Sequence, residues 1–355
     1  MTRLRALVGV LIKDLPRYLG CTAGSGDAWI RLRNRSERLV MAPDGGGIRC
    51  DWEWTSNLHA PQVMPWLGQR VFRNAIRRHR FEFAGAPTHS GRGGAVDVSF
   101  IIGHRGTDRL PQLQRTLETI AAQRDVSLEC IVVEQAPSPD VRDALPSWVR
   151  YVHTPPPVSG MPYARGWALN VGAREARGGV LILHDNDLLV PVDYAREHLS
   201  VVRRGFEVVN LKRFIFYLTR SATEQVTRRR RPVDATLGLE QILQNAQGGG
   251  SLVMTRSAFL EIGGFDEAFV GWGGEDNEIW QRALTRRLYP FGRLPLVHLW
   301  HAPQSDKRAL HGRGLHTAAL FEKRLDKTPE ARIADLCRRP FGAPSSPADP
   351  DSNAV

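Results

Sequence analysis

Two aspartates, Asp185 and Asp187, stand two residues apart directly after the apolar run 180–183. Carboxylates at this spacing can reach one cation together with its phosphate ligands. Hard divalent ions such as Mg²⁺ and Mn²⁺ prefer oxygen ligands and often bridge to a diphosphate. The same pair also fits an acidic turn that binds nothing, because this spacing is common. A metal site therefore needs support from other residues.

A second cluster combines glycines with carboxylates, over residues 271–278, which read GWGGEDNE. Glycines let a backbone approach a ligand closely, and Trp272 offers an aromatic face that can stack on a sugar ring. Glu275 and Asp276 are neighbouring carboxylates that can bind hydroxyls and accept a proton at neutral pH. The acidic residues also suit the first turn of a helix, where the helix dipole favours negative charge. Both interpretations can hold together.

Two histidines, His298 and His301, follow three residues apart near the end of an apolar run. They can converge on one metal ion if a strand ends there, since imidazole is a common ligand of divalent metals. A single histidine is more often structural, and His104, His153 and His184 are weaker candidates.

The elements that must position these residues alternate between strands and helices. Apolar runs predict four buried or half-buried strands, and helical spacing of apolar residues predicts helices between them. This alternation predicts a doubly wound, mostly parallel sheet, whose ligands lie beyond the carboxyl ends of the strands. The predicted strands are 98–102, 128–133, 149–153 and 180–184. Polar residues stand at the ends of the first, second and fourth strands, at 103–105, 134–135 and 184–187.

The chain as a whole divides into four parts. Residues 1–95 read as a separate basic unit with short strands at 29–33 and 38–42, and its role is unknown. Residues 96–310 form the predicted α/β domain, with helices at 256–262 and around 278–286 and a late strand at 296–300. Residues 311–339 read as a helical extension. From Pro340 the chain is rich in Pro, Ser and Asp and is expected to be disordered, over 340–355.

Charge and cysteine content narrow the class of protein. The net charge is +11, and residues 1–95 contribute +8 of it, from 15 Lys/Arg and 7 Asp/Glu. The basic run Arg228–Arg231 lacks interleaved aromatics, so we expect no nucleic-acid partner. The four cysteines form no CxxC pair, which argues against a zinc site or a disulfide framework.

The apolar run Ala6–Ile12 is too short to span a bilayer. We therefore expect a soluble, cytoplasmic protein, with peripheral contact to a membrane through the basic N-terminal unit.

Taken in order, the clusters resemble a known enzyme superfamily. Residues 184–191, HDNDLLVP, resemble the metal-binding stretch of β-1,4-galactosyltransferases, and residues 248–280, GGGSLVMTRSAFLEIGGFDEAFVGWGGEDNEIW, resemble their C-terminal donor and acceptor region. Polypeptide N-acetylgalactosaminyltransferases and bacterial family 2 glycosyltransferases have a related pattern. The strands VSFIIGHRG and IVVEQ are similar to the nucleotide-binding half, so the resemblance covers about residues 96–305.

This resemblance implies a GT-A fold: a Rossmann-like, mostly parallel central sheet flanked by helices, here with a small additional N-terminal unit. It implies a UDP-sugar donor and a Mn²⁺ (or Mg²⁺) cofactor. The implied metal ligands are Asp187, His301 and, where galactosyltransferases have methionine, His298. Asp185 would contact the ribose or the metal's water shell. The implied catalytic residues are Asp276 as the base and Glu275. The implied donor-binding residues are Arg105, Glu134, Asn170, Asp185, Gly249, Gly250, Trp272, Gly273 and Gly274.

The implied reaction is an inverting transfer of a hexose or N-acetylhexosamine from the UDP-sugar to an acceptor hydroxyl, by one displacement. The acceptor would be a carbohydrate, a lipid-linked sugar or a small molecule. Two alternatives stay open. A nucleotide-sugar-forming nucleotidyltransferase would carry an extended Gly-rich loop after the first strand, which GHRGTDR lacks. A non-catalytic sugar-binding protein on the same fold would be expected to have lost Asp276 or the aspartate pair.

Overall fold

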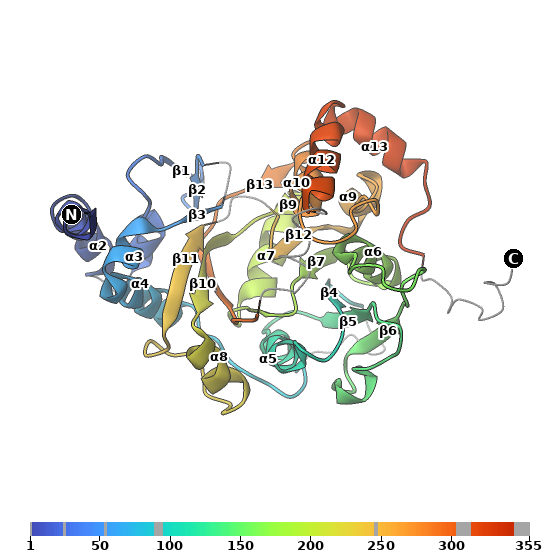
Figure 1. Cartoon of the computed structure of the whole chain (residues 1–355), viewed down its shortest axis with the longest axis horizontal. Helices are drawn as coiled ribbons and strands as arrows, with labels where there is room; N and C mark the ends of the chain where they lie inside the picture. The colour runs from blue at the N-terminus through green and yellow to red at the C-terminus, as the bar shows by residue number, and fades with distance from the viewer. Residues whose placement is uncertain are drawn as a thin grey trace, which may run out of the picture.

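The computed structural model describes residues 2–23, 26–52, 55–88, 95–244, 248–302 and 314–343. Its centre is a seven-stranded sheet in the order β13-β9-β12-β7-β4-β5-β6 (Figure 1). Four neighbouring strands are parallel, as the alternation of strands and helices predicts: β7 (Val180–His184), β4 (Val98–His104), β5 (Leu128–Glu134) and β6 (Arg150–His153). Strand β12 (Ser251–Thr255) is antiparallel to both of its neighbours, β7 and β9 (Val208–Val209). The edge strand β13 (Leu288–Tyr289) pairs in parallel with β9.

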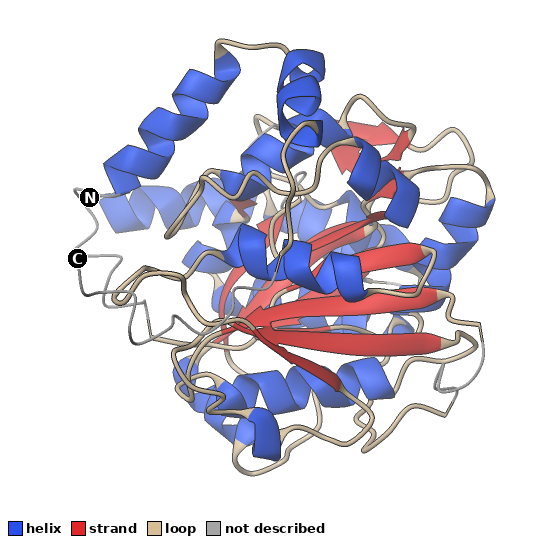
Figure 2. Cartoon of the chain, turned by 90° about the vertical axis from the view of Figure 1, so that its right-hand side faces the viewer, coloured by secondary structure: helices blue, strands red, loops and turns tan. Residues whose placement is uncertain are grey.

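Helices cover both faces of this sheet (Figure 2) because its central strands are apolar on both sides. In β4, Phe100 and Ile102 pack on one face, with residues of α5 (Leu110–Ala121) and α7 (Tyr194–Arg203). Ile101 points to the other face, with residues of α6 (Arg165–Glu175), α9 (Arg256–Glu261) and α10 (Glu275–Ala283). The predicted α/β class with a mostly parallel sheet is therefore confirmed.

A second, five-stranded sheet has the order β3-β11-β10-β14-β8. Its strands are β3 (Ser56–Asn57), β11 (Leu239–Gln244), β10 (Lys212–Leu218), β14 (Leu294–His298) and β8 (Leu188–Leu189). β10 and β14 are parallel, and β8 pairs antiparallel with β14. Because β8 directly follows the end of β7, the carboxyl end of β14 is brought beside the carboxyl end of the first sheet. Helix α8 (Arg220–Thr227) follows β10, and a short 3-10 helix, η2 (Arg142–Ala144), precedes β6.

The N-terminal residues form small elements that pack on the second sheet, on the left of Figure 1. They are α1 (Thr2–Lys13), α2 (Leu15–Thr22), the 3-10 helix η1 (Asp27–Arg31), β1 (Leu39–Met41), β2 (Ile48–Cys50), α3 (His59–Val63) and α4 (Pro65–Arg78). Trp29 and Phe72 are fully buried in one cluster with Phe214 and Phe216 of β10. The strand predicted at 29–33 is wrong: this segment is mostly η1, since Trp29 is turned inward against the sheet. The strand predicted at 38–42 is confirmed by β1.

These contacts bear on the domain division. Residues 2–88 share their core with β10, β11 and β14, and β3 pairs with β11. They extend the second sheet and add no core of their own within the described residues. Whether residue 95 is a functional boundary stays a prediction.

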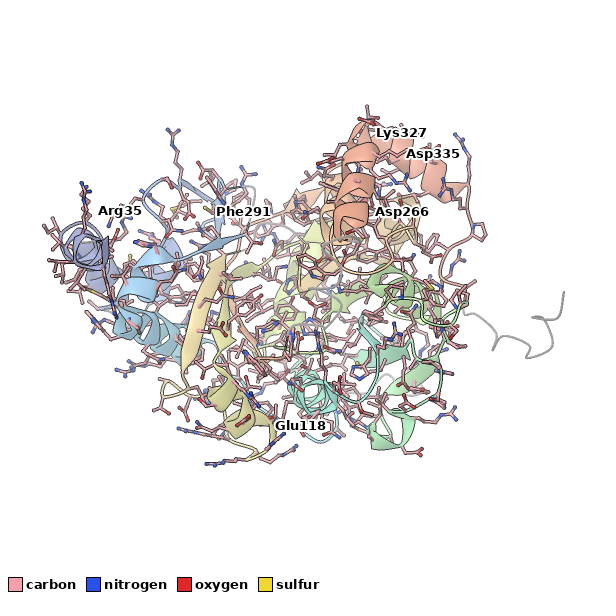
Figure 3. The ribbon with its side chains drawn as sticks, viewed as in Figure 1. Arg35, Glu118, Asp266, Phe291, Lys327 and Asp335 are labelled. Atoms are coloured by element: carbon pink, nitrogen blue, oxygen red, sulfur yellow. The ribbon has the colours of Figure 1, made fainter. Side chains whose placement is uncertain are left out.

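The C-terminal extension is helical as predicted, with α12 (Gly314–Leu325) and α13 (Pro329–Cys337). Arg324 of α12 pairs with Asp266 at 2.7 Å, and Lys327 pairs with Asp335 at 2.6 Å (Figure 3). Of the tail expected to be disordered, residues 340–343 are described and Phe341 packs against Phe259, at 6.2 Å between ring centroids. Residues 344–355 lie outside the described residues.

Among the described residues, each helix is too short or too polar to cross a membrane.

The shared core predicts that the N-terminal elements stabilise the whole chain. Trp29→Ala should lower the free energy of unfolding by about 3–5 kcal/mol, since it empties a fully buried site of a large side chain. Urea denaturation followed by circular dichroism measures this. Trp66→Ala is the matched control, because Trp66 is 49% exposed and its loss should change stability little. Equal effects of the two variants would contradict the shared core.

Candidate functional site

Parallel strands of both sheets, among them β4, β10 and β14, end at a cleft of about 540 Å³. It is lined by residues that the sequence analysis singled out and by several that it missed. The predicted ones are Asp185, Asp187, Gly249, Gly250, Trp272, Glu275, Asp276, His298 and His301. These predicted residues come from four separate segments that meet at one place, which none of the individual motifs could establish.

Asp187, His298 and His301 form a group that can hold a metal ion, with one ligand atom of each within 4.8 Å of the others. The pairing of β8 with β14 places them: His298 lies opposite Leu188, and the Leu299 amide donates to the Asp187 carbonyl at 2.8 Å. The Asp187 carboxylate thus lies 3.6 Å from Nε2 of His298 and 3.4 Å from Nε2 of His301.

The two rings present Nε2 to the group for different reasons. Nδ1 of His301 lies 2.9 Å from the carbonyl of Ala302, so a hydrogen on Nδ1 leaves the lone pair on Nε2 for a metal. His298 stacks on Tyr217, with 4.1 Å between ring centroids, and burial lowers its pKa, which favours the neutral ring that a metal needs. One carboxylate and two imidazoles suit a transition metal such as Mn²⁺ better than Mg²⁺, which takes oxygen ligands.

A cation of the protein already contacts this group. Nη1 of Arg109, just before α5, lies 3.1 Å from Asp187. Burial alone would raise the pKa of Asp187, but His298, Arg109 and His301 together hold that pKa below its ordinary value. Asp187 is therefore a buried carboxylate anion in the lining of the cleft, which favours the binding of a cation.

Asp185 falls outside the metal group and belongs to a second network. Arg165, the first residue of α6, contacts Asp185 at 2.7 Å and Asp276 at 2.6 Å, and lies 4.0 Å from Glu275. Burial would lower the pKa of Arg165, yet the three carboxylates raise it well above its ordinary value. The guanidinium thus joins the end of β7 to the start of α10. The sequence analysis missed Arg165, because a single arginine at a helix start is not distinctive.

Glu275 and Asp276 occupy the first turn of α10, as the sequence predicts, but they differ in environment. Glu275 is buried, and its Oε2 accepts a hydrogen bond from the Gly273 amide at 3.1 Å. Burial, and next the charge of Asp276, raise the pKa of Glu275 to about 7. Asp276 is more exposed and faces the cleft, so it has the better access to a substrate hydroxyl.

The glycines shape two walls of the cleft. Gly250 has φ +77° and its carbonyl accepts from the Asp185 amide at 2.9 Å. The buried Lys212 holds this turn, because its Nζ donates to the carbonyls of Gly249 and Ser251 at 2.6 and 2.8 Å. On the opposite wall Gly271, Gly273 and Gly274 all have positive φ, and they present Trp272 with 58% of its surface exposed.

A second cleft of about 700 Å³ adjoins the first and is richer in arginine. The two share several lining residues, among them Arg109, Trp272 and His301. Its basic residues are Arg105, which the sequence analysis predicted, and Arg109, Arg220 and Arg228, which it did not. Arg220 also lies over the Trp300 ring, at 5.2 Å from the centroid. This cleft is suited to an anionic ligand with an aromatic or sugar portion.

Four predicted donor-binding residues lie outside the linings of both clefts: Gly273 and Gly274, next to Trp272, and Glu134 and Asn170. Glu134 is buried at the end of β5, where it accepts from the Tyr151 hydroxyl at 2.6 Å. Asn170 is buried within α6, and its side chain donates to the Phe265 carbonyl and to Glu267, both at 2.9 Å. In this structure both residues make structural contacts behind the site, and their predicted roles toward a nucleotide stay predictions.

The metal group predicts which aspartate matters for metal binding. Asp187→Asn should weaken the binding of Mn²⁺ about tenfold or more, since it removes the charge of the group's carboxylate. Free Mn²⁺ measured by electron paramagnetic resonance during titration reports this directly. Asp185→Asn is the matched control and should change the affinity much less. An equal loss in both variants would mean that the ion binds between the two aspartates.

The raised pKa of Glu275 predicts how stability depends on pH. The folded protein holds this proton up to about pH 7, whereas the unfolded chain releases it near 4.5, so the wild type loses stability as the pH rises between these values. Glu275→Gln removes this loss, and its advantage over the wild type should grow by about 1–3 kcal/mol between pH 4.5 and 8. Thermal unfolding across this range tests it, with the exposed Glu322→Gln as control. A pH-independent difference would contradict the buried, protonated state.

Comparisons with known proteins show which families this chain is similar to. Residues 107–263 match the model of glycosyl transferase family 2, and residues 241–295 match the model described as the N-terminal domain of galactosyltransferase. The mouse chondroitin sulfate N-acetylgalactosaminyltransferase 1 is 28% identical over 174 residues, which are 44% of this chain and 32% of the relative. The human chondroitin sulfate N-acetylgalactosaminyltransferase 2 is 32% identical over 152 residues, 39% of this chain and 27% of the relative. The chain thus spans about a third of the length of these curated relatives.

Solved structures give more distant likenesses. A mannosyltransferase from Pyrobaculum calidifontis in complex with GDP-Man and Mn²⁺ is 18% identical, with a TM-score of 0.44 over 77% of this chain and 76% of the other. The catalytic domain of Drosophila β1,4-galactosyltransferase 7 in complex with xylobiose is 15% identical, with a TM-score of 0.31 over 58% and 65%. The two matched ranges overlap, so the chain has a region that matches the family 2 glycosyltransferase model and runs on into a segment that matches the galactosyltransferase model.

Proposed function

We propose that this protein is an inverting, metal-dependent glycosyltransferase that moves a hexose or N-acetylhexosamine from a UDP-sugar to an acceptor hydroxyl. One observation carries the proposal: a metal-binding group and a carboxylate suited to act as a base line the same cleft. A sugar-binding protein without catalysis would need neither. The two family models support the same reaction class.

Asp187, His298 and His301 would hold the ion, which we propose to be Mn²⁺. A bound divalent ion supplies Lewis-acid stabilisation of the charge that builds on a departing diphosphate. The mixed ligand set supports Mn²⁺ over Mg²⁺, and the Nε2 atoms of both rings already face the carboxylate.

The arginine-rich cleft is our proposed site for the nucleoside diphosphate. Arg105 and Arg109 line it, and Arg109 also lies at the metal group, so a diphosphate there would lie against both positive charges. Tyr163 lines both clefts and adds an aromatic face for a base. The sugar would then extend into the adjoining cleft, between the Gly249–Gly250 turn and Trp272.

Asp276 is the proposed general base. It faces the cleft where the acceptor would enter, and it would take the proton from the attacking hydroxyl as the new glycosidic bond forms on the face opposite to the leaving diphosphate. Arg165, which also lines the cleft, would position this carboxylate, because its guanidinium contacts both Asp276 and Asp185. Glu275, protonated near neutral pH, would donate a hydrogen bond to a substrate hydroxyl.

The acceptor is a carbohydrate, a lipid-linked sugar or a small molecule in this proposal. The relatives by name transfer N-acetylgalactosamine in chondroitin sulfate, and one structural neighbour holds a xylose disaccharide. The names of these proteins agree with a carbohydrate acceptor. They do not identify the sugar that this chain transfers.

The experiment that tests the donor is a thermal-shift measurement with nucleotides. UDP with Mn²⁺ should raise the melting temperature by a few degrees at saturating concentration, because it binds only the folded state. UDP without Mn²⁺, and Mn²⁺ with ADP, CDP or GDP, are the controls and should give smaller shifts. A larger shift with GDP than with UDP would replace the proposed donor, and no shift with any nucleotide would remove the donor site.

The assignment of the base predicts a separation of chemistry from binding. Asp276→Asn should lower kcat about 10²–10⁴-fold, since the amide cannot accept the proton, while the affinity for UDP changes little. Single-turnover transfer and a nucleotide titration measure the two quantities. Glu322→Gln, an exposed carboxylate on α12, controls for the loss of charge. Transfer by Asp276→Asn at nearly the wild-type rate would show that another group accepts the proton.

A further inference from the structure

Helix α1 presents its apolar face to solvent. Its exposed apolar residues recur at the spacing of one helix face, and between 37% and 70% of the surface of each is exposed. They are Leu4, Leu7, Val8, Leu11 and Ile12. A surface helix ordinarily turns such a face toward the core, so this arrangement is inverted. The exposed stripe is contiguous, which distinguishes it from single exposed apolar residues.

Contacts on the inner side fix this orientation. Val10 is fully buried in the core beneath α1, together with Tyr18 and Trp29. Arg35, at the left end of the molecule in Figure 3, donates to the Gly9 carbonyl at 2.9 Å and pairs with Asp14 at the end of the helix. The helix cannot rotate its apolar stripe inward without breaking these contacts.

Positive charges lie on both sides of the stripe. Arg3 and Arg5 are exposed neighbours of Leu4, and at 3.6 residues per turn they lie about 100° to either side of it. Residues 1–95 carry 15 Lys/Arg against 7 Asp/Glu, so the surrounding segment is also basic. Arginine side chains can reach from the edge of such a stripe to a phosphate while their stems stay on the apolar surface. Apolar residues in the middle and cations at the edges match an anionic phospholipid surface, with its phosphates above its acyl chains.

We propose that α1 binds an anionic phospholipid surface, lying in the plane of the interface with its apolar stripe in the acyl boundary. A helix of 12 residues is about 18 Å long, which suits this in-plane position. The cations favour a charged lipid surface over a second copy of this chain, since two basic segments repel each other. The proposal is independent of the proposed transfer reaction, because α1 is absent from the linings of both clefts.

The test is flotation of the full chain with vesicles of phosphatidylcholine containing 30% phosphatidylglycerol, and with vesicles of phosphatidylcholine alone. The full chain should float with the anionic vesicles, and 0.5 M NaCl should reduce its partitioning severalfold. Leu4→Gln/Leu11→Gln should lower the partition coefficient about tenfold or more, and Arg3→Gln/Arg5→Gln should lower it severalfold on anionic vesicles only.

The matched control is Val40→Gln/Met41→Gln, which removes two other exposed apolar side chains, on β1, and should leave partitioning unchanged. All these positions are exposed, and an unchanged melting temperature verifies the fold. Equal flotation of the α1 variants and the wild type, or no flotation at all, would overturn the proposal. A further outcome would also overturn it: the wild type forms a dimer by light scattering, Leu4→Gln/Leu11→Gln is monomeric, and neither binds vesicles. The stripe would then join two copies of the chain.

Discussion

The candidate site depends on one largely buried cation, the guanidinium of Arg165, whose side chain is 16% exposed. A buried charge is costly unless oppositely charged groups compensate it, and Asp185 and Asp276 do so here. These carboxylates repel one another, so they can lie together only around such a cation. Arg165 and Asp185 belong to the family 2 region and Asp276 to the galactosyltransferase-type segment, and the ion pairs thus fix the two matched segments to each other.

The pairing of strands places the remaining site residues. The antiparallel strand β12 begins where β7 ends, so the turn before it, with Gly249 and Gly250, lies beside Asp185. The short strand β8 carries the chain from the end of the first sheet onto β14 of the second, which brings Asp187 to His298. The metal group therefore lies at a junction of two sheets, and a shift of one residue in either pairing would disperse it.

Much of the fold was predictable because the sequence of strands 98–104 to 180–184 is locally unambiguous: long apolar runs, each followed by polar residues. The joint position of Asp187, His298, Glu275 and Asp276 followed from a resemblance of ordered motifs. Arg109, Arg165 and Lys212 could not be predicted, because their roles depend on contacts between residues far apart in the chain. For the same reason the segment at 29–33 was wrongly predicted as a strand: its apolar residues pack against β10, and no local pattern reports that contact.

The pair of Arg109 and Asp187 has a consequence for the order of events at the metal group. Since a guanidinium already neutralises the carboxylate, the proposed divalent ion would replace it as counter-ion of Asp187 and would leave Arg109 without its anion. A diphosphate that enters with the ion restores the balance, as its oxygens can face Arg109 and the ion together. If the proposed function holds, electroneutrality would make the ion and the diphosphate a joint ligand, each of which binds more weakly alone than together with the other.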